Sequence, residues 1–175
     1  MQLVLTTPVV KRLQRELRRA RRREIGGLLL GEHLGGELFS VVDISVQRMG
    51  GTDSCFTRAP GAHQDQLEKF FTDTGRDYAR FNYLGEWHSH PGFEPIPSET
   101  DFHTMQSLVE DPEVGVNFAV LLITKLGKRK HLEATVTAFR ANATPISVPL
   151  LVESGPVADD GFTWKWLSRL FGRNR

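Results

Sequence analysis

The sequence predicts a single α/β domain, and three observations lead to this fold class. Its 175 residues, 39% apolar and 25% charged, have the composition of a globular protein and suffice for one hydrophobic core. Residues 8–22 repeat apolar side chains at helical spacing. Apolar runs of strand length follow, beginning with 25–31, and alternate with further helical patterns. A chain that alternates helices and strands in this way packs helices on a sheet.

The first predicted helix, 8–22, presents one apolar stripe and one basic face. The stripe repeats at steps of three and four residues, so it packs inward while the arginines face water. Its members are Val10, Leu13, Leu17 and Ala20. The strand that follows at 25–31 is a buried run, Ile-Gly-Gly-Leu-Leu-Leu-Gly, whose glycines indicate close approach of neighbouring backbone.

The middle of the chain predicts one more strand, a loop and a helix. A Gly-Gly turn leads into the strand, 37–46, in which apolar and polar side chains alternate. The segment 49–62 is rich in Gly, Thr, Ser and Pro, which predicts a loop with room for a short strand at 55–58. A helix over 63–80 gathers its apolar side chains on one side: Leu67, Phe70, Phe71 and Tyr78.

The second half of the chain completes the sheet and ends in a separate tail. Gly155 and Pro156 divide the domain, residues 1–152, from a C-terminal segment, residues 153–175, with a short basic amphipathic helix. That helix either contacts a partner or an anionic membrane surface, or it folds back on the core. The predicted elements are strands 82–88, 116–124, 131–140 and 146–152, a stiff Pro-rich loop 91–97, and helices 98–110 and 162–171.

Charge and cysteine content restrict the function classes. Residues 11–23 hold eight Lys/Arg and one Glu, whereas residues 24–163 hold ten basic and twenty acidic residues. Such a basic run either binds nucleic acid or is a solvated helix face, and the apolar stripe favours the second reading. Cys55 is the one cysteine, so no internal disulfide forms. The apolar N-terminus is too short for a membrane span, which predicts a cytoplasmic protein.

A fourteen-residue window, HSHPGFEPIPSETD, carries the chemistry. His88 and His90 are two apart on an extended segment, so they share one face of a strand. Asp101 follows eleven residues later and returns to that face through the loop. Two imidazoles, one carboxylate and an open fourth position form a hydrolytic zinc site, which brings the pKa of its water to roughly 7. Ser98 and Asp101 also match the spacing of a helix capping box.

This window resembles the JAMM motif of the JAB1/MPN metallopeptidases, which also contains an upstream glutamate. Glu24, in REIGGLLLG, stands where that glutamate is expected, and the resemblance covers about residues 5–145. It implies the JAB/MPN (cytidine-deaminase-like) fold, a curved mixed β-sheet flanked by helices with zinc at a strand end. By resemblance the ligands of one Zn²⁺ are His88, His90 and Asp101, Glu24 is the general base, and Ser98 stabilises the oxyanion.

Other residues near the motif have less certain roles. Glu86 shares the strand face of the histidines, where it either supports a ligand or is solvated. His103 is two residues past Asp101 on a helix and therefore points away from the ligand side. The segments 56–59 and 93–96 are candidate walls for a bound substrate, since each carries an aromatic residue beside the motif.

The form GEWHSHP resembles the prokaryotic branch of the family, and this implies a function. We expect zinc-dependent cleavage after the C-terminal glycine of a ubiquitin-like protein, as deconjugation or precursor processing, in a bacterial antiphage conjugation system. The partners would be a ubiquitin-like protein or its conjugate and E1-like and E2-like proteins. Three alternatives stay open: processing of a sulfur-carrier protein, a RadC-like nucleic-acid-associated module, and a catalytically inactive scaffold.

Overall fold

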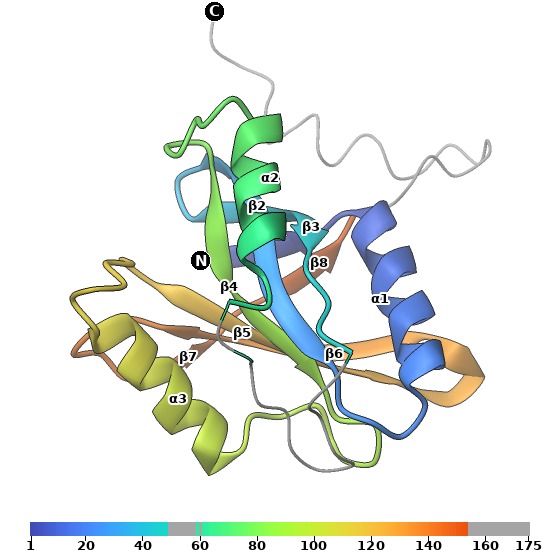
Figure 1. The fold of residues 1–175 in the computed structure, drawn as a ribbon. Coiled ribbons are helices and arrows are strands. Elements are labelled where there is room, and N and C mark those ends of the chain that lie inside the picture. The colour runs from blue at the N-terminus through green and yellow to red at the C-terminus, as the bar shows by residue number, and fades with distance from the viewer. Residues whose placement is uncertain (49–58, 60, 154–175) are drawn as a thin grey trace, which may run out of the picture.

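The computed structural model describes residues 1–48, 59 and 61–153, and this part of the chain forms one mixed β-sheet with helices on both faces (Figure 1). The α/β prediction is therefore confirmed. In chain order the elements are β1 (Gln2–Leu5), α1 (Thr7–Ala20), β2 (Gly26–Gly35), β3 (Leu38–Ile44), α2 (Gln64–Asp73), β4 (Phe81–Ser89), α3 (Glu99–Glu110), β5 (Ala119–Leu126), the 3₁₀ turn η1 (Lys128–Lys130), β6 (Leu132–Phe139), β7 (Ile146–Ser147) and β8 (Leu150–Val152).

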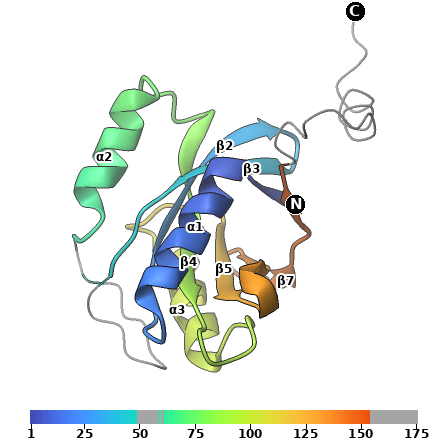
Figure 2. The same cartoon turned by 90° about the vertical axis from the view of Figure 1, so that its right-hand side faces the viewer.

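The strand that carries the histidines lies in the middle of the sheet. The order of the eight strands is β7-β6-β5-β4-β2-β3-β1-β8. β4 pairs antiparallel with β2 on one side and parallel with β5 on the other, so its backbone is hydrogen-bonded along both edges. The sheet curls strongly, as the two perpendicular views show (Figures 1 and 2). The predicted curved mixed sheet is thus confirmed.

Alternate side chains of the central strands divide the core between the two faces. On β5, Val120 and Leu122 belong to the cluster that packs on α1, whereas Leu121 and Ile123 pack with α3. β2 behaves in the same way, because Leu29 faces α1 while its two neighbours pack against α2. The run 25–31 was predicted to be buried, and it is buried because helices cover both faces of the sheet. α1 therefore covers one face, and α2 and α3 cover the other.

Three elements differ from the prediction. The single strand predicted at 146–152 is two strands, β7 and β8, on opposite edges of the sheet. β1 was not predicted, because only five residues precede the Thr-Thr-Pro segment and its partner strands, β3 and β8, lie far away in sequence. The second helix ends at Asp73 rather than near residue 80, because Gly75 and Arg76 adopt positive φ angles of 67° and 57°. Tyr78 still packs its ring edge-on against Phe71, with ring centroids 4.9 Å apart.

The close backbone approaches predicted for the glycines of β2 are confirmed. A Cβ atom at Gly27 would lie 2.2 Å from the carbonyl oxygen of Ser45, and one at Gly31 would lie 2.5 Å from the carbonyl oxygen of Ser40. Backbone atoms cannot move aside as a flexible side chain can. β2 therefore sits where it does because these two positions lack a side chain.

Substitution of Gly27 by alanine is expected to lower the free energy of unfolding by about 3 kcal/mol, because the new methyl group overlaps backbone of the neighbouring strand. Gly92→Ala is the matched control, since a Cβ there meets nothing within 4 Å. Urea unfolding of both variants measures the difference, and the control should change by less than about 0.5 kcal/mol. Equal stability of the two variants would contradict this packing.

Some predictions fall outside the described residues. These are the short strand at 55–58, the helix at 162–171, most of the wall at 56–59, and Cys55. The division of the chain between residues 152 and 153 stays a prediction. None of the helices in the described part is long and apolar enough to cross a membrane.

Candidate metal centre

The end of β4 places His88 and His90 on the α3 side of the sheet. β2 pairs with this segment so that Gly26 lies opposite His88. The residue before Gly26, Ile25, exchanges two hydrogen bonds with Ser89. The Ser89 amide donates to the Ile25 carbonyl at 2.9 Å, and the Ile25 amide donates to the Ser89 hydroxyl at 3.0 Å. The His90 amide donates to the Thr124 carbonyl on β5. Both histidines therefore leave a backbone that is held on two sides.

The structure brings His88, His90 and Asp101 together as the sequence predicted. Their candidate ligand atoms all lie within 4.8 Å of one another. The two Nε2 atoms are 3.2 Å apart, and His88 Nε2 is 3.4 Å from Asp101 Oδ1. Each histidine is less than one tenth exposed. Two imidazole nitrogens and one carboxylate oxygen converging on a single point are a donor set that suits a divalent transition metal.

Asp101 reaches this point from the first turn of α3, where it belongs to a capping box. The backbone amide and the hydroxyl of Ser98 both donate to Asp101 Oδ2 at 2.7 Å, and the Asp101 amide donates to the Ser98 hydroxyl. Burial raises the pKa of Asp101, but His88 and the bonds from Ser98 outweigh it and lower the pKa to about 2. The carboxylate is therefore ionised, with Oδ1 turned toward His88.

His90 is oriented by a backbone carbonyl that the sequence did not single out. Its Nδ1 lies 3.0 Å from the carbonyl oxygen of Glu94, which can only accept a hydrogen bond. Nδ1 must therefore carry the proton, which leaves the lone pair of Nε2 for a metal. Burial lowers the pKa of His90, and this favours the neutral ring that a metal requires. No residue type marks a carbonyl contact of this kind, so sequence reasoning could not find it.

Glu24 is buried beside this cluster, in the short connection between α1 and β2. Glu24 is 4% exposed, so it is a buried carboxylate and not a surface charge. Burial raises the pKa of Glu24, the charge of His88 lowers it, and the charge of Asp101 raises it further. A buried carboxylate beside His88 and Asp101 has a position from which it can exchange protons with a group bound at the cluster.

The raised pKa of Glu24 predicts a stability difference in metal-free protein. Because the folded state binds this proton more tightly than the unfolded chain, ionised Glu24 destabilises the fold above its folded-state pKa. The destabilisation vanishes below the unfolded pKa, about 4. In excess chelator, Glu24→Gln should therefore be more stable than wild type at pH 7, and this gain should shrink toward pH 4. Urea unfolding at both values tests this, and a wild type that is the more stable at pH 7 would contradict it.

Two further residues of the motif region can now be placed. His103 is exposed and lies 3.9 Å from Glu99 on the outer side of α3, so the prediction that it points away from the ligands is confirmed. Glu86 is half-buried in the middle of β4 and its Oε1 atom is buried, and whether Glu86 supports a ligand stays open.

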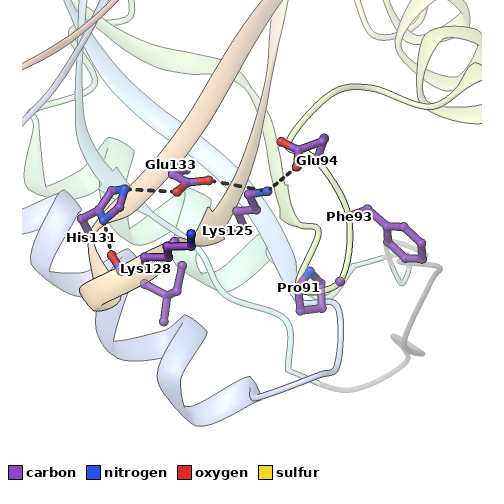
Figure 3. A pocket seen from close by; sticks show the side chains of 10 residues that line it. Pro91, Phe93, Glu94, Lys125, Lys128, His131 and Glu133 are labelled. Atoms are coloured by element: carbon purple, nitrogen blue, oxygen red, sulfur yellow. Dashed lines mark hydrogen bonds and ion pairs between the residues drawn. The ribbon is translucent and has the colours of Figure 1, made fainter.

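A groove of about 710 Å³ opens next to His90 (Figure 3). One wall is the loop of Pro91, Gly92, Phe93 and Glu94, and the other is the turn between β5 and β6. Lys125 crosses between the walls, with Nζ 3.0 Å from a Glu94 oxygen and 3.5 Å from a Glu133 oxygen. The ring of Phe93, which is 56% exposed, meets His90 edge-on. Of the predicted wall at 93–96, Phe93 and Glu94 line this groove beside His90, and the role of the wall in substrate binding stays a prediction.

Comparison with protein families and known proteins gives one consistent result. The family model described as prokaryotic homologs of the JAB domain matches residues 6–141. The CD-NTase/cGAS isopeptidase of Vibrio cholerae serotype O1 is 33% identical over 119 residues, which cover 65% of this chain and 72% of that protein. The ubiquitin carboxyl-terminal hydrolase RPN11 of Saccharomyces cerevisiae is 32% identical over 84 residues, which cover 48% of this chain and 26% of that protein.

A solved structure shares the fold. The solution structure of protein DSY2949 from Desulfitobacterium hafniense superposes with a TM-score of 0.64, covering 88% of this chain and 94% of that one. Its sequence is 19% identical, so this likeness concerns the fold alone. The sheet order and helix placement described above therefore belong to a known architecture.

Proposed function

Because this chain belongs to the family of prokaryotic JAB-domain homologues, we propose that it is a zinc-dependent isopeptidase that cleaves after the C-terminal glycine of a ubiquitin-like protein. The observation that carries this proposal is the buried carboxylate of Glu24 beside the cluster of His88, His90 and Asp101. Hydrolysis of an amide needs an electrophile and a base at one point. His88, His90 and Asp101 would hold the electrophilic metal, and Glu24 is the base.

The similar proteins support both the reaction and the substrate class. One is named an isopeptidase that acts on CD-NTase/cGAS, and another is named a ubiquitin carboxyl-terminal hydrolase. We therefore infer deconjugation in a bacterial antiphage system, with a ubiquitin-like modifier or its conjugate as substrate. E1-like and E2-like proteins would attach the modifier that this chain removes.

The residues of the site divide the work between holding the metal and moving protons. His88, His90 and Asp101 would hold zinc, which when bound acidifies water and polarises a carbonyl group. Glu24 takes the proton from the attacking water and returns it to the leaving amine. Its raised pKa suits this exchange, since the group must both accept and release a proton near neutral pH. The Glu94 carbonyl keeps the ring of His90 in the orientation that a ligand needs.

Ser98 is expected to act twice, and Ser98→Ala should separate the two roles. Its hydroxyl now donates to Asp101, and in the reaction it turns to the oxygen that gains negative charge while its amide still holds Asp101. Loss of the hydroxyl should lower kcat about 100- to 1000-fold. Loss of the helix cap should lower the free energy of unfolding by about 1 kcal/mol. A variant with unchanged kcat and lowered stability would leave Ser98 as a cap only.

The proposal is tested by mass spectrometry of the products. Zinc-loaded protein is incubated with a ubiquitin-like protein that carries a C-terminal extension, and in parallel with the same fusion in which alanines replace the last two glycines. Cleavage directly after the terminal glycine, stopped by chelator and absent from the alanine fusion, supports the proposal. A sulfur-carrier precursor is tested in parallel, and cleavage of that precursor alone would assign the site to precursor processing. If zinc-loaded protein cleaves neither the ubiquitin-like fusion nor the precursor, the proposal is overturned.

A further inference from the structure

The arginines of α1 fall into two groups. Two of them, Arg15 and Arg19, share the carboxylate of Glu16, which is 1% exposed and also pairs with Arg48 at 2.9 Å. These arginines serve the fold. At the end of the helix stand four exposed arginines whose side chains pair with no carboxylate in the described part of the chain: Arg18, Arg21, Arg22 and Arg23.

The turn between β5 and β6 brings further cations to the same place. The side-chain amide of Gln14 on α1 lies 3.5 Å from the carbonyl of Lys130, so the turn lies beside the helix (Figure 1). Arg21 and Arg23 line a hollow of about 90 Å³ together with Lys125 of β5. We call the exposed side chains of the helix end and the turn the basic surface, which consists of Arg18, Arg21, Arg22, Arg23, Lys128 and Lys130.

The basic surface adjoins the metal centre. Arg23 directly precedes Glu24, and the hollow that Arg21 and Arg23 line is closed by Ser89 and Pro91, the neighbours of His90. Pro91 and Lys125 line both this hollow and the groove of Figure 3. The arginines therefore flank, from the α1 side of the sheet, the strand end that carries the histidines.

Helix stability accounts for Arg18, which lies in the last turn of α1, but not for the arginines that follow the helix. The C-terminal end of a helix favours positive charge, but the effect fades within the last turn, and α1 ends at Ala20. The next three residues are arginines in a row, the first with a positive φ of 58°. Like charges held so close repel one another, which destabilises the fold unless an anion lies among them.

We propose that the basic surface binds a carboxylate-rich segment of the protein substrate, next to the bond that is cleaved. This inference rests on the proposed function. Guanidinium groups bind carboxylates through two parallel hydrogen bonds, and within the described residues these exposed arginines have no carboxylate partner that would occupy their donors.

The surrounding charges favour an acidic protein segment over nucleic acid. Residues 24–163 carry twenty acidic and ten basic residues, and Glu94 and Glu133 line the adjoining groove. A phosphate backbone is charged at every nucleotide, so those carboxylates repel it along its whole length. A protein segment can place carboxylates on the basic surface and present neutral backbone to the groove and the metal centre.

Binding of a fluorescein-labelled decaglutamate peptide, followed by fluorescence anisotropy in 50 mM salt, tests the inference. Arg21→Gln with Arg22→Gln should weaken binding at least about fivefold, because each exposed ion pair contributes modestly. The control, Lys69→Gln with Arg76→Gln, removes the same charge from α2 and the turn that follows it, on the other face of the sheet, and should change binding less than about twofold. In 200 mM salt the wild-type affinity should fall.

Two results would overturn the inference directly: no peptide binding, or equal weakening in both double variants. A third would be that a ten-nucleotide single-stranded DNA binds more tightly than the peptide and that the Arg21→Gln, Arg22→Gln protein no longer binds this DNA. The last result would assign the surface to nucleic acid. The assay involves no hydrolysis, so an inactive enzyme would not be mistaken for a failed docking surface. Fusions with five glutamates before or after the scissile bond then show, by their gain in kcat/KM, whether the modifier or the leaving chain carries the acidic segment.

Discussion

Replacement of Glu24 by alanine is expected to lower the rate of hydrolysis about 10³-fold while the protein keeps its metal. General-base catalysis by one positioned side chain typically contributes 10²- to 10⁴-fold. Glu24 is not among the three side chains whose ligand atoms converge, so its removal leaves the donor set intact. The expected result is one zinc per chain together with nearly absent product.

The matched control for this variant is Glu32→Ala, which removes a carboxylate from β2, the strand that follows Glu24. Glu32 pairs with Arg80 at 2.6 Å on the surface, away from the histidines. Its loss should leave kcat within about twofold, since an exposed ion pair contributes little. If the Glu24→Ala protein hydrolyses substrate within tenfold of wild type, a different group is the base.

Asp101→Asn is expected to produce the second large effect, loss of the metal itself. The amide keeps the shape of the side chain but carries no charge to pair with His88 or with a divalent cation. Residues that only support a ligand cost 10- to 100-fold in metal affinity when removed, so loss of a ligand should cost more than about 100-fold. Competition with a chromophoric zinc chelator measures the affinity directly.

Asp111→Asn serves as the control for this second variant. Asp111 closes the other end of the same helix, where its carboxylate accepts a hydrogen bond from the Glu113 amide at 2.8 Å. Any general effect of removing a helix-terminal carboxylate should appear in both proteins. Only Asp101→Asn should lose zinc, and wild-type zinc affinity in that variant would remove Asp101 from the ligand set.

The site could be predicted from the sequence because its residues follow local rules of geometry. His88 and His90 share a strand face by simple alternation, and Ser98 and Asp101 form a capping box by their spacing. Glu24 required the family resemblance, since nothing in its own neighbourhood tells a buried base from a surface charge. Only the structure shows that Glu24 is 4% exposed.

What the sequence could not predict depends on contacts between distant segments. The edge strand β1 pairs with β3 and β8, and four residues carry too little pattern to announce it. Glu16, one acid among eight bases, looked like part of a solvated face, yet it is buried under three arginines. The carbonyl that orients His90 belongs to the backbone of Glu94, which every residue type provides.

The most direct test of the metal centre is anomalous diffraction from crystals of zinc-loaded protein, measured on both sides of the zinc absorption edge. We predict one peak per chain at His88 Nε2, His90 Nε2 and Asp101, at about 2.0–2.2 Å from each donor atom, with Glu24 beside the peak but outside the ligand set. A peak bound by other side chains, or no peak in protein that cleaves its substrate, would contradict the account.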